Sequence, residues 1–151
     1  MCSSDLFDFD APRHFIKDTA NTDIIHHNGK LLATWYLCGD VYQLDPLTLE
    51  ALGKNDFGGK LSTTVSAHPK VDARTGELVY YTLCDDPPYM RYGVVSKEGK
   101  LIHETPIDLP GPRASHDLTI TENYTVLHDL PFFHDVELQR KTGYQIGRAH
   151  V

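Results

Sequence analysis

The stretch HPKVDARTGELVYYT, residues 68–82, reads as a short strand, a tight turn and a longer strand rich in β-branched and aromatic residues. Two other stretches have the same order, TDIIHHNGKLLAT at 22–34 and HDLTITENYTVLHDL at 116–130. The three units begin 46 and then 48 residues apart. A repeat of this length, made of short strands, is the signature of propeller blades stacked around a central axis. The sequence therefore predicts an all-β fold, a partial β-propeller of about two to three blades.

The patterns between the repeats also favour strands. Asn28-Gly29 supplies the two residues of positive φ that a type I′ hairpin turn requires, and it predicts strands at 22–27 and 30–36. No segment longer than one turn carries helical periodicity. Further strands are expected at 77–83, 89–95, 100–107, 118–121 and 125–130.

Composition excludes several classes of function. The 151 residues are enough for about one domain, and the formal charge of −7 argues against a nucleic-acid surface, which needs a clustered basic face. No run approaches the roughly 18 apolar residues that a membrane-spanning helix needs, and no signal-peptide pattern is present. Three cysteines form neither a disulfide framework nor a metal-ligand spacing. We therefore expect a cytoplasmic protein that does not bind nucleic acid.

Both ends of the chain are expected to be foreign to the natural protein. Residues 2–6 can be encoded by TGCTCTTCCGATCT, and the reverse complement of that string encodes residues 146–149. The string resembles a common sequencing adapter. We therefore expect residues 1–6 and 146–151 to derive from the adapter, and residues 7–145 to be an internal fragment of one propeller domain. His150 is accordingly left out of the candidate ligands.

The repeat places two histidines at equivalent positions, His68 and His116, each at the start of its unit. Equivalent positions on the innermost strands of a propeller face one axis, so the two imidazoles are expected to converge. Pro69 fits an inner strand, because it holds His68 extended and removes a donor that an edge does not need. The residues alone leave two interpretations open, a metal site and a pair of structural histidines.

Three stretches resemble successive signatures of the carotenoid cleavage oxygenase family, which includes the lignostilbene dioxygenases. They are DTANTDIIHHNGKLLATWY at 18–36, SAHPKVDARTGEL at 66–78 and LPGPRASHDLTITENYTVLHDLPF at 109–132. The resemblance implies a seven-bladed propeller with a helical cap and a Fe²⁺ ion held by four histidines at the axis. By motif, His68 resembles the first ligand and His116 the second. The other two ligands would come from later blades, beyond Tyr144.

The implied reaction is oxidative cleavage by O2 of a conjugated C=C bond in an apolar polyene or stilbene, which gives two carbonyl products. Neutral imidazoles suit Fe²⁺ and leave coordination positions open. Membrane association of a longer protein is left open. The aromatic side chains Trp35, Tyr36, Phe132 and Phe133 could line a substrate tunnel, although packing between blades is the commoner role for such residues.

One position departs from the family pattern. Many members have at Tyr36 a glutamate that hydrogen-bonds the distal nitrogen of a ligand histidine, and the stilbene-cleaving members have a lysine where Trp35 stands. Here either Tyr36 supplies a phenol oxygen, or the orienting contact is weaker. The missing lysine favours a carotenoid or apocarotenoid substrate. A lignostilbene dioxygenase, an iron isomerase and a non-catalytic propeller that binds a ligand remain alternatives.

The metal-site hypothesis makes a geometric prediction. Two ligands of one ion at about 2.1 Å from the metal would bring the imidazoles within about 5 Å of each other. His128 and His134 are expected farther away and would be ligands only if the resemblance failed. One of His26 and His27 should face solvent. Asp117 and Glu122 are expected to be hydrogen-bonding residues of loops and turns, not an acid/base pair.

Overall fold

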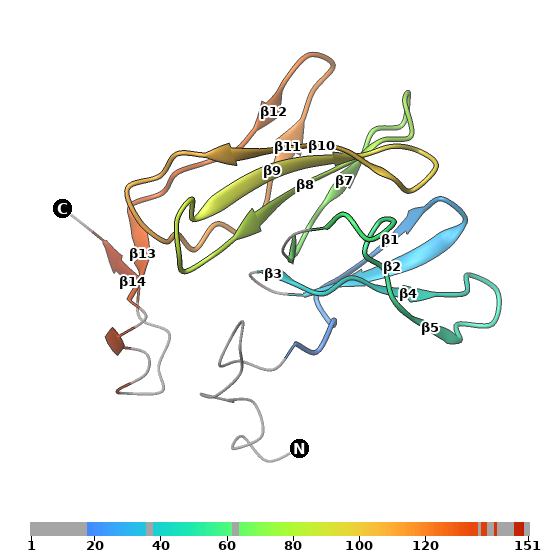
Figure 1. Cartoon of the computed structure of the whole chain (residues 1–151), viewed down its shortest axis with the longest axis horizontal. Coiled ribbons are helices and arrows are strands. Elements are labelled where there is room, and N and C mark those ends of the chain that lie inside the picture. The colour runs from blue at the N-terminus through green and yellow to red at the C-terminus, as the bar shows by residue number, and fades with distance from the viewer. Residues whose placement is uncertain are drawn as a thin grey trace.

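The computed structural model describes residues 18–35, 38–61, 64–135, 137, 138, 141 and 147–149, and its strands form separate antiparallel sheets (Figure 1). The first sheet has the order β1-β2-β4-β5 and the second β10-β9-β8-β7, while β11 pairs with β12, β13 with β14 and β3 with β6. The strands are β1 (Asp23–His27), β2 (Lys30–Thr34), β3 (Cys38–Gly39), β4 (Tyr42–Leu44), β5 (Ala51–Lys54), β6 (Val65–Ser66), β7 (Lys70–Val71), β8 (Leu78–Leu83), β9 (Met90–Val95), β10 (Leu101–Ile107), β11 (Thr119–Ile120), β12 (Thr125–Val126), β13 (Phe132–His134) and β14 (Gly147–Ala149).

This arrangement confirms the predicted all-β propeller architecture. The first strand of the first repeat unit is β1, and the first strand of the second unit is β7. Both are edge strands of their four-stranded sheets. The described residues between positions 22 and 131 form no helix. Among the described residues, no helix is long and apolar enough to cross a membrane. The expectation that both termini derive from an adapter stays a prediction, and residues 1–6 lie outside the described part.

The first hairpin follows from its turn residues. Asn28 and Gly29 both adopt positive φ, 49° and 73°, as the predicted type I′ turn requires. The turn sets the register, in which His27 pairs with Lys30 and Asp23 with Thr34. In consequence His27 is buried and His26 is exposed, which confirms that only one of the two faces solvent.

The core lies between the sheets, and β8 contributes to it on both faces. All six residues of β8 are buried. Leu78 and Tyr80 belong to a cluster that includes Leu32 of the first sheet. Val79, Tyr81 and Leu83 belong to a second cluster, with Met90 and Leu118. Because successive side chains of a strand point to opposite faces, β8 packs against both of its neighbours.

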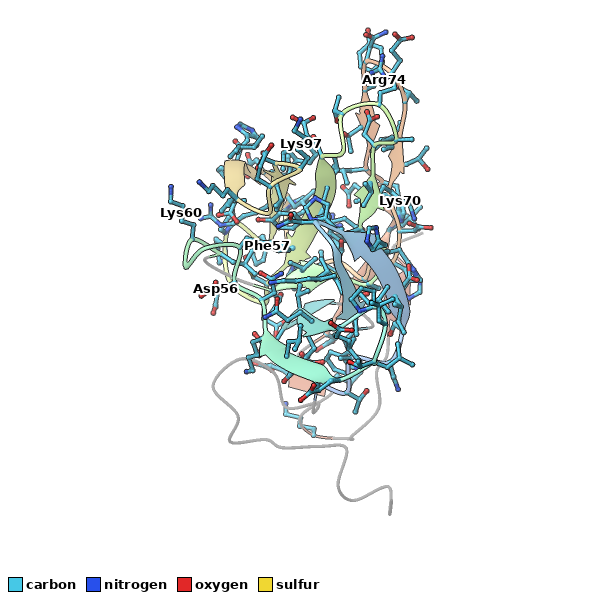
Figure 2. The ribbon with its side chains drawn as sticks, turned by 90° about the vertical axis from the view of Figure 1, so that its right-hand side faces the viewer. Asp56, Phe57, Lys60, Lys70, Arg74 and Lys97 are labelled. Atoms are coloured by element: carbon cyan, nitrogen blue, oxygen red, sulfur yellow. The ribbon has the colours of Figure 1, made fainter. Side chains whose placement is uncertain are left out.

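Polar contacts tie the neighbouring units together at their rims. His27 Nε2 lies 3.1 Å from the carbonyl oxygen of Gly76, in the turn between β7 and β8. Lys70 and Arg74, beside the β11–β12 hairpin in Figure 2, pair with Asp117 at 2.6 Å and Glu122 at 2.9 Å. The predicted hydrogen-bonding roles of both acidic residues are therefore confirmed.

Candidate metal centre

His68 and His116 come together as the repeat predicts. Their ring centroids lie 4.9 Å apart and the ring planes are inclined by 82°. His68 lies two residues before β7, and His116 lies in the segment that leads into β11. The two imidazoles therefore meet between neighbouring units from positions 48 residues apart. This separation is within the expected limit of about 5 Å for two ligands of one ion.

Buried hydrogen bonds fix the backbone on the N-terminal side of His68. The hydroxyl of Thr34 on β2 donates to the carbonyl oxygen of Ala67 at 2.6 Å. The backbone N–H of Tyr81 on β8 donates to the hydroxyl of Ser66 at 3.4 Å, and Ser66 is fully buried. These two bonds tie the segment that carries His68 to both four-stranded sheets, and β6 also pairs with β3.

The segment around His116 is held by its neighbours in sequence. The hydroxyl of Ser115 donates to the backbone carbonyl of His128 at 3.0 Å, and Leu118 is buried in the core. Asp117 accepts hydrogen bonds from the N–H of Leu118 at 2.7 Å and from Lys70 at 2.6 Å. The carboxylate of Asp117, next to His116, is therefore occupied by these two hydrogen bonds.

A carboxylate that the sequence did not single out contacts His68. Asp23, at the start of β1, places Oδ2 at 2.9 Å from Nδ1 of His68. The side chain of His68 is 25% exposed and that of Asp23 34% exposed, so water weakens this contact only in part. The one sequence feature that could have indicated Asp23 is its position beside Thr22, the residue at which the first repeat unit begins.

The electrostatics favour a neutral imidazole at His116. Its side chain is exposed, yet partial desolvation by the surrounding protein lowers its pKa, and the nearby His68 lowers it further, while Asp117 acts in the opposite direction. Metal binding requires the neutral form. Two imidazoles at this distance, one of them favoured as the uncharged ligand, fit a divalent transition metal.

The family model described as retinal pigment epithelial membrane protein (RPE65) matches residues 3–149 of the chain. The chain belongs to this family, the carotenoid cleavage oxygenases. Its similarity to a carotenoid 9,10(9′,10′)-cleavage dioxygenase of Crocus sativus is 40% identity over 120 residues, which is 76% of this chain and 21% of the relative. The chain thus spans about a fifth of the length of that relative.

Solved structures of the family contain the same arrangement of sheets. The Pseudomonas brassicacearum lignostilbene dioxygenase superposes with a TM-score of 0.77 at 37% identity, over 87% of this chain and 28% of the other. A cobalt-substituted apocarotenoid oxygenase of Synechocystis superposes with a TM-score of 0.60 at 28% identity, over 72% of this chain and 24% of the other. That relative therefore accepts a transition metal, as expected of a family of non-haem iron oxygenases.

The structure describes only some of the other residues predicted for the oxygenase site. Trp35 is 6% exposed, which favours packing between sheets over a tunnel lining. Tyr36 and His150 lie outside the described residues, as do the side chains of Phe132, Phe133 and His134. Among the described residues no group of three or more His, Cys, Asp or Glu could hold a metal ion. The roles of His68 and His116 as iron ligands stay a prediction.

Proposed function

We propose that this chain supplies two of the four histidine ligands, His68 and His116, of the iron centre in a dioxygenase that cleaves a conjugated C=C bond. The observation that carries the proposal is the meeting of two imidazoles from successive units at 4.9 Å. Belonging to the carotenoid cleavage oxygenases supports the reaction class. The other two ligands would come from blades outside the described residues.

In this proposal each part of the chain has a defined task. Fe²⁺, when bound, would supply the centre that activates O2 for addition to the double bond. The buried bonds at Ser66 and Ala67 hold the backbone beside His68, and the β11 segment holds His116. Positions left open by the histidines would admit O2 beside the substrate.

We infer that the substrate is a carotenoid or apocarotenoid. The support is the tryptophan at position 35, where stilbene-cleaving members of the family have a lysine for the substrate phenol. Similarity to the Crocus sativus dioxygenase is consistent with a carotenoid. A stilbene is the second candidate, since the lignostilbene dioxygenase of Pseudomonas brassicacearum is 37% identical.

Metal binding by the chain can be tested directly. Co²⁺ is titrated into the 151-residue chain to millimolar concentration, and the imidazole NMR signals are followed. Bound Co²⁺ should shift the signals of His68 and His116 together, and His68→Ala or His116→Ala should abolish the shift of the other ring. The control is His26→Ala on the exposed face of β1, which should change nothing. Independent responses of the two rings would refute the shared site.

The reaction is tested on the longest natural protein that contains residues 7–145. Loaded with Fe²⁺, it is given an apocarotenoid or a hydroxystilbene under ¹⁸O2, and the products are identified by mass spectrometry. Cleavage yields two carbonyl fragments that carry the label. A single unlabelled product would indicate an isomerase, and no turnover with no iron bound would indicate a non-catalytic binding propeller. The 151-residue chain alone should not turn over either substrate.

A further inference from the structure

The Asp23 carboxylate is held at both oxygens. Its Oδ1 accepts a hydrogen bond of 2.8 Å from the backbone N–H of Ile24, and its Oδ2 lies 2.9 Å from Nδ1 of His68. The first bond is local and fixes which oxygen faces the imidazole. The second joins the first repeat unit to the second. Asp23 therefore presents a preoriented acceptor to one particular nitrogen of the ring.

Thr34 on β2 contacts the backbone beside both members of the Asp23–His68 pair. Thr34 pairs with Asp23 across β1 and β2, and its hydroxyl lies 3.4 Å from the carbonyl oxygen of Asp23. That hydroxyl also donates to Ala67, the residue before His68. A buried side chain on β2 thus contacts the backbone of Asp23 and the backbone next to His68.

A carboxylate that only accepts hydrogen bonds determines where the proton of a neutral imidazole lies. The hydrogen bond from Nδ1 places the proton on that atom and leaves the lone pair on Nε2. Nε2 of His68 forms no hydrogen bond with any described residue. Carboxylates that orient metal-bound histidines in this way raise the basicity of the ligand nitrogen.

We propose that Asp23 is a positioning residue that locks His68 in the Nδ1–H tautomer and thereby assigns Nε2 to the metal. The proposal rests on the function proposed for His68. It also explains how a chain with tyrosine at position 36 can keep an orienting carboxylate: another residue of the first unit, Asp23 on β1, supplies one. Asp23 contacts neither O2 nor substrate in this role.

The decisive variant is Asp23→Asn, which keeps the shape of the side chain. If the amide oxygen keeps the bond to the N–H of Ile24, the amide N–H₂ faces Nδ1 of His68. A donor at that place requires Nδ1 to be an acceptor, so the proton moves to Nε2 and blocks the ligand nitrogen. The tautomer of His68 should therefore invert. Long-range ¹H–¹⁵N correlation spectra of the metal-free chain at pH 8.5 report it directly.

The matched control is Asp117→Asn, which removes one negative charge from the same neighbourhood without touching Nδ1 of His68. It should leave the tautomer unchanged. An Nε2–H tautomer in the unmodified chain, or the same tautomer in both Asp23→Asn and the unmodified chain, would overturn the proposal. If Asp23→Asn failed to fold, Asp23→Ala, which opposes no tautomer, should give a mixture of the two in place of one.

A metal titration then separates this proposal from the function it rests on. The Asp23→Asn chain should bind Co²⁺ about tenfold or more weakly than the unmodified chain, while Asp117→Asn changes the affinity less than twofold. Equal affinities with an inverted tautomer would refute the positioning role. Absence of Co²⁺ binding by the unmodified chain, with the Nδ1–H tautomer present, would count against the metal site and leave the tautomer assignment standing.

Discussion

The inner edge of the sheets and the centre of the second sheet differ in how they are built. At the inner edge lie polar and partly exposed side chains, Asp23, His68 and His116, joined by single contacts. In the second sheet β8 is buried along its whole length and packs apolar residues on both faces. We therefore expect the free energy of unfolding to come mainly from the blade interiors, whereas the candidate metal site lies on edges that should contribute little to it.

A large loss of stability should follow Gly93→Ala in β9. Gly93 pairs with Tyr80, and an added Cβ would lie 2.2 Å from the ring atom Cζ of that tyrosine. The ring crosses β9 to donate a hydrogen bond of 3.0 Å to Glu104 on β10, so it cannot move without losing that bond. We expect a loss of about 3 kcal/mol or unfolding, measured by urea denaturation.

The double variant Gly93→Ala with Tyr80→Leu tests the cause. If the ring is the obstacle, the second substitution should cost much less in the Gly93→Ala background than it does alone. Additive effects would show that the backbone of β9, and not the tyrosine, makes glycine necessary.

Truncation of one side chain on each face of the first hairpin tests the difference between interior and edge. Leu32 on β2 is 1% exposed and belongs to the core, whereas Ile24 on β1 is 61% exposed. Leu32→Ala should cost about 2–5 kcal/mol, and Ile24→Ala less than about 0.5 kcal/mol. Urea midpoints at constant slope give both values. A comparable cost at the two positions would contradict the division between interior and edge.

An intermediate effect is expected from pH. Burial lowers the pKa of His27, more than its bond to Gly76 raises it. Because the folded chain prefers the neutral ring, its contribution to stability is complete above the unfolded pKa of about 6.5 and falls as the pH drops through it, by at most about 1.4 kcal/mol per pH unit. Urea midpoints at pH 7.5 and 5.5 measure this loss. His27→Gln should show a smaller loss, and an equal loss would refute the role of His27.

A small effect is expected from the ion pair between Lys70 and Asp117. Lys70 and Asp117 are both partly exposed, so Lys70→Met should destabilise the chain by less than about 1 kcal/mol, and the difference should shrink in 1 M salt. Thermal denaturation at low and high salt measures it. A larger loss that salt does not change would mean that the pair anchors the third unit.

The sequence predicted the strands that have a local cause. The Asn28-Gly29 turn gave β1 and β2 to within two residues, and the aromatic runs gave β8 and β9 to within one. The strands β4 and β5 were missed, because Tyr42–Leu44 is too short to show a period and the exposed β5 has no apolar alternation. Their pairing with β2 comes from the completed sheet, which no local pattern records.

The residues of the candidate site also differ in whether the sequence could predict them. The two histidines were predictable because the repeat makes their positions equivalent and the family motif names them. Asp23 was not, since its bond to His68 joins residues 45 positions apart in different units. In the family pattern the orienting carboxylate stands at the position of Tyr36, so nothing local pointed to Asp23.

The two-sided burial of β8 has a consequence for folding fidelity. A slip of one residue in the pairing of β8 with β9 would turn Leu78 and Tyr80 towards the third unit and Val79 and Tyr81 towards the first. Both clusters would then receive side chains of the wrong volume at once. A slip of one residue therefore satisfies neither neighbour, so packing on both faces of β8 disfavours that register.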